Sequence, residues 1–378
     1  MVKLIVSGGG TGGHIYPALA IADGLRQRLP QADIRYIGAK GGMESRIVPA
    51  AGYPFWGIRA EGWQGRKIRT LARALKADIS GKKEAQALLS AFQPEAVIGT
   101  GGFVCLPVGM AAAQLRIPIL LHEQNAQPGL TNRMIALWAK RIFINFEEAA
   151  DRFPPFCKQK IRLTGLPVRQ HIADADRAEA CAYFQLEGDK KTVLAVGGSQ
   201  GATSINRAML YVVGKLHQNT DVQILFSTGQ RDYRQMEEEM AAAGIEWEIS
   251  SGKRSNIRML PYIDRMDLAF AAADLYVGRA GASTLAEITL NRLPAILVPL
   301  PHAAENHQAY NAASLADKGA AVTMEDQKLS GPALLQVLGE LLADDRRRLA
   351  MADCSYLASH RRALDDILDN IEETRKES

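Results

Sequence analysis

Short apolar runs alternate along the chain with longer segments whose apolar residues recur every three or four positions. In the first half these runs lie at residues 3–6, 33–38, 95–100, 118–123 and 141–145. Residues 15–25, between the first two runs, have the spacing of an amphipathic helix. Strands separated by helices are typical of a parallel sheet with helices on both faces. The pattern therefore predicts an α/β fold with doubly wound parallel sheets.

The same order of elements begins again in the middle of the chain. Residues 191–216 repeat the opening pattern of apolar run, glycine loop and helix, and further apolar runs follow at 222–229, 275–284 and 295–300. A chain of 378 residues accommodates two such domains. We expect an N-terminal domain over residues 1–166 and a C-terminal domain over residues 167–349, with a final helix of about 350–378 packed back on the first domain.

Composition and charge exclude several classes of protein. Hydrophobic residues make up 47% of the chain and charged residues 23%, as in a soluble globular protein, and a formal net charge of +4 does not indicate nucleic-acid binding. Four scattered cysteines argue against a zinc site or a disulfide framework and favour a reducing compartment. The first apolar run is too short for a signal peptide. Gln114 and Arg116 interrupt the most apolar stretch, so we expect no transmembrane segment.

Five glycines lie between the first strand and the first helix, at Gly8 to Gly13. Amides at a helix N-terminus, the helix dipole and glycine backbone together favour a bound phosphate. Gly8, Gly10 and Gly13 match a dinucleotide-binding motif only weakly, because residues 38–40 end the next strand without an acidic group. A P-loop is excluded, since no Lys-Ser or Lys-Thr pair follows. We expect a phosphate-bearing ligand; a tight turn that binds nothing is the alternative.

Two further glycine turns follow predicted strands, at residues 99–103 and 197–201. Ligands of open α/β sheets bind beyond the carboxyl ends of the strands, where these turns should emerge. If the two domains face each other, the turns would line one cleft.

Six motifs in order resemble one known family, the peptidoglycan N-acetylglucosaminyltransferases of bacteria. They are SGGGTGGHIYPALA, IGTGGFVCLP, HEQNAQPGLTNR, GGSQGA, PYID and GRAGASTLAE, and the resemblance runs from residue 4 to about residue 320. It implies a GT-B fold, in which two Rossmann-like domains with doubly wound parallel sheets face a cleft. It also implies an enzyme of peptidoglycan synthesis, and thus of cell-wall biogenesis, cell shape and cell division.

The reaction that the resemblance implies is an inverting sugar transfer without a cofactor. The donor would be UDP-N-acetylglucosamine, and the acceptor lipid I, undecaprenyl-pyrophosphoryl-N-acetylmuramoyl-pentapeptide. Attack by the muramoyl 4-hydroxyl on the sugar C1 would give lipid II and UDP. The enzyme would act peripherally at the cytoplasmic face of the cell membrane, on an anionic inner-membrane surface, together with proteins of cell-wall synthesis or division.

The resemblance further implies residues for each part of the donor. Asn125 would contact the sugar and Gln308 its hydroxyls; Arg169 and Ser199 would address the pyrophosphate. Ile263 would meet uracil through its backbone, and Glu287 would accept both ribose hydroxyls. One departure is Leu166, where the family often has asparagine, so a side-chain contact is lost there. The donor-binding set is Thr11, Gly12, Gly13, Asn125, Arg169, Ser199, Ile263, Ala282, Ser283, Thr284, Leu285, Ala286, Glu287 and Gln308.

A general base for the attacking hydroxyl has two candidates. His14 follows the glycine loop and belongs to a residue type that titrates near neutrality. The alternative is that it only donates a hydrogen bond to a phosphate or caps the helix. Glu123 could also act as base, or could hold the loop that carries Asn125. For its neighbour His122 the favoured interpretation is a satisfied histidine at a domain interface.

The pair Asp174 and Asp176 has the spacing of a metal-binding Asp-x-Asp motif. It precedes a helical stretch that begins at Arg177, where an aspartate is a common N-cap. Two carboxylates also rarely complete an oxygen-ligand shell. We therefore expect no metal site here.

Residues 63–83 combine an apolar stripe with seven lysines and arginines. Ile68, Leu71, Leu75 and Ile79 share one face of a helix, and Asp78 is the single acidic residue. Such a segment can lie on an anionic leaflet. The alternative is an ordinary amphipathic helix that packs its stripe on the sheet.

Other functions share parts of this pattern. The nearest is a GT-B transferase with another lipid or a soluble acceptor, because its donor half would look alike. A UDP-N-acetylglucosamine 2-epimerase shares the two-domain fold, although HEQNAQPGLTN is not its pattern. A non-catalytic nucleotide-binding module would not need the second set of loops.

Overall fold

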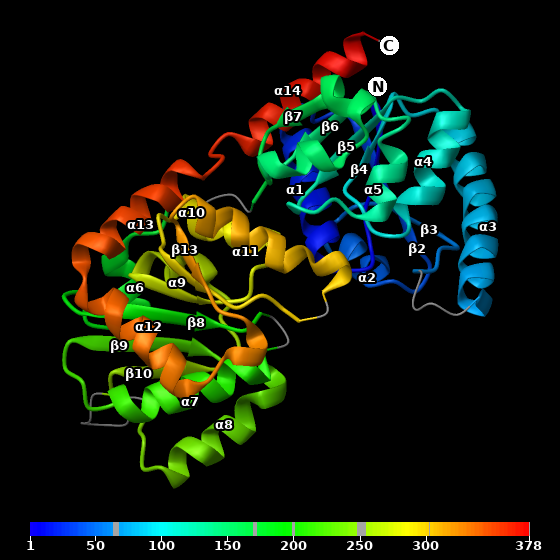
Figure 1. The fold of residues 1–378 in the computed structure, drawn as a ribbon. Coiled ribbons are helices and arrows are strands. Elements are labelled where there is room, and N and C mark those ends of the chain that lie inside the picture. Colours follow the sequence, from blue (N-terminus) through cyan, green and yellow to red (C-terminus); the bar gives the residue numbers. More distant parts are fainter. Residues whose placement is uncertain (63–67, 169–171, 199–200, 248–254, 302, 378) are drawn as a thin grey trace. The chain divides into compact units, whose positions relative to one another are not determined.

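The computed structural model describes the chain except residues 63–67, 169–171, 199–200, 248–254, 302 and 378; the side chains of 68–76 and 304 are also left aside. The chain forms two compact units (Figure 1). The first comprises Met1–Val168 and His360–Ser378, and the second Arg169–Ser359.

A parallel seven-stranded sheet forms the centre of the first unit, with strand order β3-β2-β1-β4-β5-β6-β7. Side chains alternate between its faces, so that Ile5 points to one face while Leu4 and Val6 point to the other. Helices α3, α4 and α5 cover the first face, and α1, α2 and the C-terminal helix α14 cover the second. Its elements are β1 (Lys3–Ser7), α1 (Gly12–Arg28), β2 (Asp33–Ala39), α2 (Glu44–Ala50), β3 (Phe55–Ile58), α3 (Ile68–Phe92), β4 (Ala96–Gly99), α4 (Cys105–Gln114), β5 (Ile119–Glu123), α5 (Leu130–Ile135), β6 (Arg141–Ile144), η1 (Glu147–Arg152), η2 (Pro155–Lys160), β7 (Ile161–Leu163) and α14 (Ala363–Lys376).

The second unit has a parallel six-stranded sheet, with strand order β10-β9-β8-β11-β12-β13. One face packs against α7, α8 and α12 in a core that includes Val193, Ile224 and Leu338. Its elements are α6 (Arg177–Phe184), β8 (Lys191–Val196), α7 (Thr203–Leu216), β9 (Val222–Ser227), α8 (Gln230–Ala242), β10 (Ile257–Leu260), α9 (Met266–Ala272), β11 (Leu275–Gly278), α10 (Ala282–Leu290), β12 (Ala295–Leu297), η3 (Ala304–Asn306), α11 (His307–Asp317), β13 (Ala321–Thr323), η4 (Asp326–Lys328), α12 (Gly331–Ala343) and α13 (Asp345–Leu357).

The predicted fold class, two doubly wound parallel sheets, is confirmed. In both sheets the strand order reverses at the first strand, between β1 and β4 and between β8 and β11. Such a switch point leaves a crevice at the carboxyl edge of the sheet, where ligands of this fold class bind. The glycine turns lie at these two points, which makes the carboxyl edges the places to look for a site.

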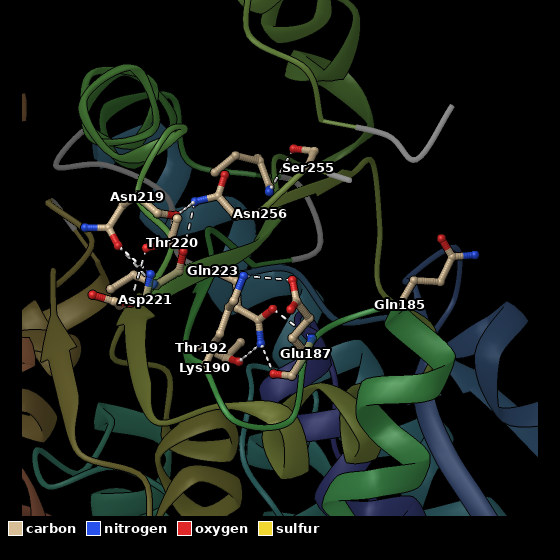
Figure 2. Close-up of polar contacts among 12 residues, drawn as sticks. Gln185, Glu187, Lys190, Thr192, Asn219, Thr220, Asp221, Gln223, Ser255 and Asn256 are labelled. Atoms are coloured by element: carbon tan, nitrogen blue, oxygen red, sulfur yellow. Dashed lines mark hydrogen bonds and ion pairs between the residues drawn. The ribbon is translucent and has the colours of Figure 1, made fainter. Parts of the chain in front are cut away.

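The amino edge of the second sheet, by contrast, is held together by its own polar groups (Figure 2). The side-chain Nε2 of Gln223 donates to Thr192 Oγ1 at 2.9 Å and to the carbonyl of Glu187 at 2.7 Å. Asn256 donates to the carbonyl of Val222 at 2.8 Å, which joins the starts of β9 and β10. These side chains satisfy backbone and side-chain groups of neighbouring strands, so this edge is structural.

The length and apolar character of the helices show whether any of them could cross a membrane. Of the helices that the described residues form, none combines the length and the apolar character that crossing a bilayer requires.

Candidate functional site

Two loops are in backbone contact at the switch point of the first sheet. The glycine loop 8–13 follows β1, and the turn 99–103 follows β4; the amide of Gly9 donates to the carbonyl of Gly101 at 3.2 Å. Gly102 has φ +84°, and a Cβ there would lie 2.1 Å from the carbonyl oxygen of Gly9. The contact therefore requires glycine at residue 102, because both the space and the left-handed backbone exclude a side chain.

Helix α1 begins in this loop without a side-chain cap. Its N-cap residue Thr11 is extended and forms no capping hydrogen bond, and the first turn has no acidic residue. The N-cap residues of α7 and α10, Ala202 and Gly281, likewise form no side-chain cap. All three helices follow glycine turns at the switch points, and their first amides and dipoles favour an anion.

Three helices away from the switch points are capped by their own side chains, whereas others, such as α8 and α9, are not. Asp176, Ser330 and Asp344 accept hydrogen bonds from the first turns of α6, α12 and α13. The predicted N-cap role of Asp176 is confirmed, since its Oδ1 accepts from Ala178 and Glu179 amides at 2.8 and 3.2 Å. Within the described residues, no three His, Cys, Asp or Glu side chains gather in a way that could hold a metal ion.

A backbone carbonyl orients His14 at the first turn of α1. The Nδ1 atom lies 3.0 Å from the carbonyl oxygen of Thr100, which also accepts from Gln124 Nε2 at 2.6 Å. A carbonyl can only accept, so Nδ1 carries the proton, and in the neutral form of the ring the lone pair is on Nε2. His14 thus has the tautomer that a general base acting through Nε2 requires.

Glu123, the other candidate base, is buried, and both of its carboxylate oxygens accept hydrogen bonds from residues 125–132. Its Oε1 accepts from the Asn125 amide at 2.9 Å and from Asn125 Nδ2 at 3.2 Å. Its Oε2 accepts from the Gly129 amide at 3.2 Å and from Asn132 Nδ2 at 2.7 Å. Burial raises the pKa of Glu123 to about 6. With 1% of its surface exposed, this carboxylate holds the loop that carries Asn125.

His122 lies next to it with no exposed surface. Its Nε2 is 2.9 Å from the carbonyl oxygen of Gly165, in the segment that follows β7. Burial lowers the pKa of His122 to about 4, so the ring is neutral at physiological pH. It connects β5 to this segment within the first unit.

Glu44 is a buried residue of this edge that sequence reasoning missed. Its Oε2 accepts from the Gly10 amide at 3.3 Å and its Oε1 from the Ala39 amide at 3.0 Å. Cβ atoms added at Gly38 or Gly42 would lie 2.6 Å from its side chain. One carboxylate therefore ties the glycine loop to the end of β2, and it occupies the Gly10 amide. No motif signals this role, because the bonded residues are 34 and five positions apart in sequence.

The candidates of the second unit lie beyond the carboxyl ends of β10, β11 and β12; β11 and β12 are neighbours, and β10 is an edge strand separated from that pair by β9 and β8. Ile263 follows β10 and is buried, whereas Ala282 to Glu287 form the start of α10 after β11. Gln308, on α11 after β12, accepts from the Leu300 amide through Oε1 at 2.9 Å. Glu305 and Asn306, just before it, both have positive φ, 51° and 56°. Non-glycine residues in this region often mark functional sites.

Arg279, in the turn between β11 and α10, was also missed. Its guanidinium forms an ion pair with Asp326 at 2.5 Å and donates to Ser204 Oγ at 3.0 Å. It also donates to the carbonyl of Val298 at 3.1 Å. Since this charge is paired internally, Arg279 connects the β11 turn to the start of α7.

Two sequence candidates, Arg169 and Ser199, fall outside the described residues. The structure brings the others together in two groups: Thr11, Gly12, Gly13, His14, Glu123 and Asn125 on the carboxyl edge of the first sheet, and Ile263, Ala282, Ser283, Thr284, Leu285, Ala286, Glu287 and Gln308 on that of the second.

Comparisons with known proteins address the whole chain. Residues 4–144 match the glycosyltransferase family 28 N-terminal domain, and residues 192–367 match the family 28 C-terminal domain. Proteins of Desulforamulus reducens and Moorella thermoacetica are each 44% identical, over 98% and 99% of both chains. The chain belongs to glycosyltransferase family 28.

Both of these family 28 relatives are named "UDP-N-acetylglucosamine--N-acetylmuramyl-(pentapeptide) pyrophosphoryl-undecaprenol N-acetylglucosamine transferase". A solved structure, the Acinetobacter baumannii MurG, is 28% identical with a TM-score of 0.78 and covers 99% of this chain and 100% of that one. The family 28 chain is therefore a glycosyltransferase of the GT-B fold.

Proposed function

We propose that this enzyme transfers N-acetylglucosamine from UDP-N-acetylglucosamine to the muramoyl 4-hydroxyl of undecaprenyl-pyrophosphoryl-N-acetylmuramoyl-pentapeptide. The observation that carries the proposal is full-length similarity to transferases named for this reaction. Two further observations support it. Helices α7 and α10 follow glycine turns and have no side-chain cap, which suits the anion of a sugar nucleotide. A histidine lies at the first turn of α1, and the acceptor hydroxyl needs a base.

The donor binds to the second unit, mainly within residues 167–349. The first turns of α7 and α10 face the diphosphate with their amides, and Arg169 and Ser199 contribute from the adjoining segments. Glu287, one turn into α10, accepts the ribose hydroxyls, and the backbone at Ile263 meets uracil. Gln308 accepts a hydrogen bond from the Leu300 amide through Oε1. Its NH₂ group would donate to the sugar hydroxyls.

The acceptor binds to the first unit, within residues 1–166. The 4-hydroxyl oxygen attacks C1 of the donor sugar from the face opposite UDP, and its proton passes to His14 Nε2. The bond from C1 to the phosphate oxygen breaks, and its electron pair leaves with UDP. Amides at helix N-termini stabilise the charge that develops on the diphosphate without a metal ion. Glu123 keeps the Asn125 loop in place, because its buried oxygens already accept four hydrogen bonds.

The first unit also carries a surface suited to a membrane. Leu130, Met134, Leu137 and Trp138 follow helical spacing along α5 and the turn after it, and each is 38–45% exposed. Lys160 lies beside them and donates to the Leu137 carbonyl at 3.3 Å. An apolar face with basic neighbours fits the interface of an anionic bilayer, where a polyprenyl acceptor resides. The basic segment 63–83, most of whose side chains lie outside the described residues, would bind the same anionic leaflet at the cytoplasmic face of the membrane.

Purified enzyme with UDP-N-acetylglucosamine and a lipid I analogue tests the reaction. We expect UDP release and a disaccharide product only when the muramoyl lipid is present. A His14→Ala variant should lose about 10²–10⁴ in kcat while it still binds UDP. Epimerised sugar without acceptor, or equal transfer to a glycerolipid or soluble alcohol, would contradict the proposal.

Vesicle sedimentation tests the membrane surface separately. Leu137→Glu and the pair Arg69→Glu and Arg73→Glu should each weaken binding to vesicles that contain anionic lipid. Leu349→Glu is the matched control, because Leu349 is an exposed apolar residue of the second unit. Unchanged sedimentation of the first two variants would remove this part of the proposal.

A further inference from the structure

Two cations lie side by side at the carboxyl edge of the first sheet, outside the groups assigned above. Lys40 directly follows β2 and Arg59 directly follows β3, and the paired positions just before them are Ala39 and Ile58. The Lys40 amide donates to the Ile58 carbonyl at 2.8 Å, which fixes the two residues as neighbours. Their side chains are 60% and 69% exposed.

Both cations share one carboxylate, that of Glu84 on α3. Lys40 Nζ lies 3.3 Å from Glu84 Oε2, and Arg59 Nε lies 3.4 Å from Oε1. The Arg59 amide also donates to Oε2 at 3.0 Å. A Cβ at Gly81 of α3 would lie 2.0 Å from the Arg59 carbonyl oxygen, so the close approach depends on glycine there. Two positive charges against one negative charge leave this small cluster with a net charge of +1.

The cluster is joined to the glycine loop through Glu44. The Glu44 carboxylate bonds the Gly10 amide on one side and the Ala39 amide on the other, and Lys40 is the next residue. In the strand order β3-β2-β1, Lys40 is one strand from the glycine loop and Arg59 is two. With about 4.8 Å between neighbouring strands, the cations lie roughly 5–10 Å sideways from the loop.

We infer that Lys40 and Arg59 form a binding site for the diphosphate of the acceptor lipid; this inference rests on the proposed function. In the muramoyl sugar the reacting 4-hydroxyl and the C1 diphosphate are at opposite ends of the ring. With the hydroxyl at His14 beside the glycine loop, the diphosphate reaches the ends of β2 and β3. The lipid chain then leaves towards α3, which carries Glu84.

Glu84 aligns the two cations before the acceptor arrives. An exposed ion pair by itself contributes little to stability. A diphosphate offers more acceptor oxygens than one carboxylate and suits the planar guanidinium of Arg59. The arrangement thus exchanges a weak internal pair for stronger contacts with the substrate.

The test compares two acceptors in the full-length enzyme: a short-chain lipid I analogue and a matched analogue in which an uncharged linker replaces the diphosphate. We expect Lys40→Ala and Arg59→Ala each to raise KM for the diphosphate acceptor about tenfold, with KM for the uncharged acceptor and for UDP-N-acetylglucosamine unchanged. The rise in KM with added salt should also be smaller in the variants than in the wild type.

Lys328→Ala and Arg234→Ala are the controls, because both residues are exposed cations in ion pairs of the second unit. Variants that raise KM equally for both acceptors, or for the donor, would overturn the inference while the proposed function stands. A wild-type enzyme inactive on both acceptors would refute the proposed function and the inference with it. A wild type that does not prefer the diphosphate acceptor would overturn the inference alone.

Discussion

The loop that carries Asn125 is held by a group that titrates within the range of an enzyme assay, since burial raises the pKa of Glu123 to about 6. The ionised carboxylate accepts four hydrogen bonds, and a protonated carboxyl cannot accept all of them. We expect kcat/KM to fall roughly fourfold from pH 7.5 to pH 5.5 through this group, because about three quarters of it is protonated at the lower pH.

The same shift predicts that the fold survives this loss of activity. The folded-state pKa lies above the ordinary value of 4.5, so the folded protein binds the proton more tightly than the unfolded chain. The contribution of Glu123 to stability therefore falls as pH rises from about 4.5 to about 6 and is constant above that range. Near-UV circular dichroism should stay unchanged at pH 5.5, and Glu123→Gln should have a lower but flatter profile. If this variant kept the wild-type acid limb, a group other than Glu123 would be responsible.

The contact between the two glycine loops of the first unit gives a second prediction at this scale. Gly102→Ala places a methyl group 2.1 Å from the Gly9 carbonyl oxygen in a left-handed backbone. We expect the variant to lose about 2–4 kcal/mol of stability and most of its activity. Gly129→Ala is the control on the same edge, because Gly129 has φ −66° and nothing within 4 Å of the added Cβ. Urea denaturation and initial rates measure both; equal stabilities would contradict the assigned contact.

Sequence motifs located the residues that follow one another in a loop but missed those that support them from elsewhere. His14 and Glu123 belong to motifs whose spacing is visible in the chain. Glu44 and Arg279 act through partners such as Gly10 and Asp326, which lie 34 and 47 positions away. A buried glutamate in a helical segment has the same local sequence as an exposed one, so only the tertiary structure reveals its role.

The elements show a similar division between what the pattern predicted and what it missed. The strands it predicted, such as β1, β4, β8 and β11, lie inside the sheets and form apolar runs because both faces are covered. The four strands that it missed, β3, β7, β10 and β13, are the edge strands of the two sheets and have only three or four residues each. Edge strands pair on one side only, so they need less length and apolar character, and their signal is weak.

Close packing of α14 on α1 predicts a stability effect at the level of elements. A Cβ at Gly24 of α1 would lie 2.8 Å from Leu368 Cδ1 and 3.0 Å from Leu364 Cδ1. Gly24→Val should therefore push α14 outward and cost about 1–3 kcal/mol. Gly339→Ala, in α12, has nothing within 4 Å of the new Cβ and should stabilise by about 0.5–1 kcal/mol through helix propensity. Denaturant midpoints of the two variants that shifted in the same direction would contradict this packing.

Among the described residues, each unit buries apolar residues of its own: one hydrophobic cluster packs on a face of the second sheet, and two others cover the faces of the first sheet. Since each unit buries its own apolar residues, the units should unfold in separate transitions. A ligand that binds one folded unit stabilises that unit by RT ln(1 + [L]/Kd), about 2.7 kcal/mol at a hundredfold excess over Kd. If UDP binds the second unit, calorimetry with UDP should raise one transition and leave the other in place.

The tryptophans identify which transition belongs to which unit. Trp247 lies in the second unit, and Trp56, Trp63 and Trp138 lie in the first part of the chain. In a Trp247→Phe variant the fluorescence therefore reports the first unit alone, and its midpoint should not move with UDP. In the wild type the UDP-sensitive transition should appear by far-UV circular dichroism and by calorimetry. A UDP-dependent shift of the Trp247→Phe fluorescence midpoint would mean that UDP also stabilises the first unit, and the donor would then not belong to the second unit alone.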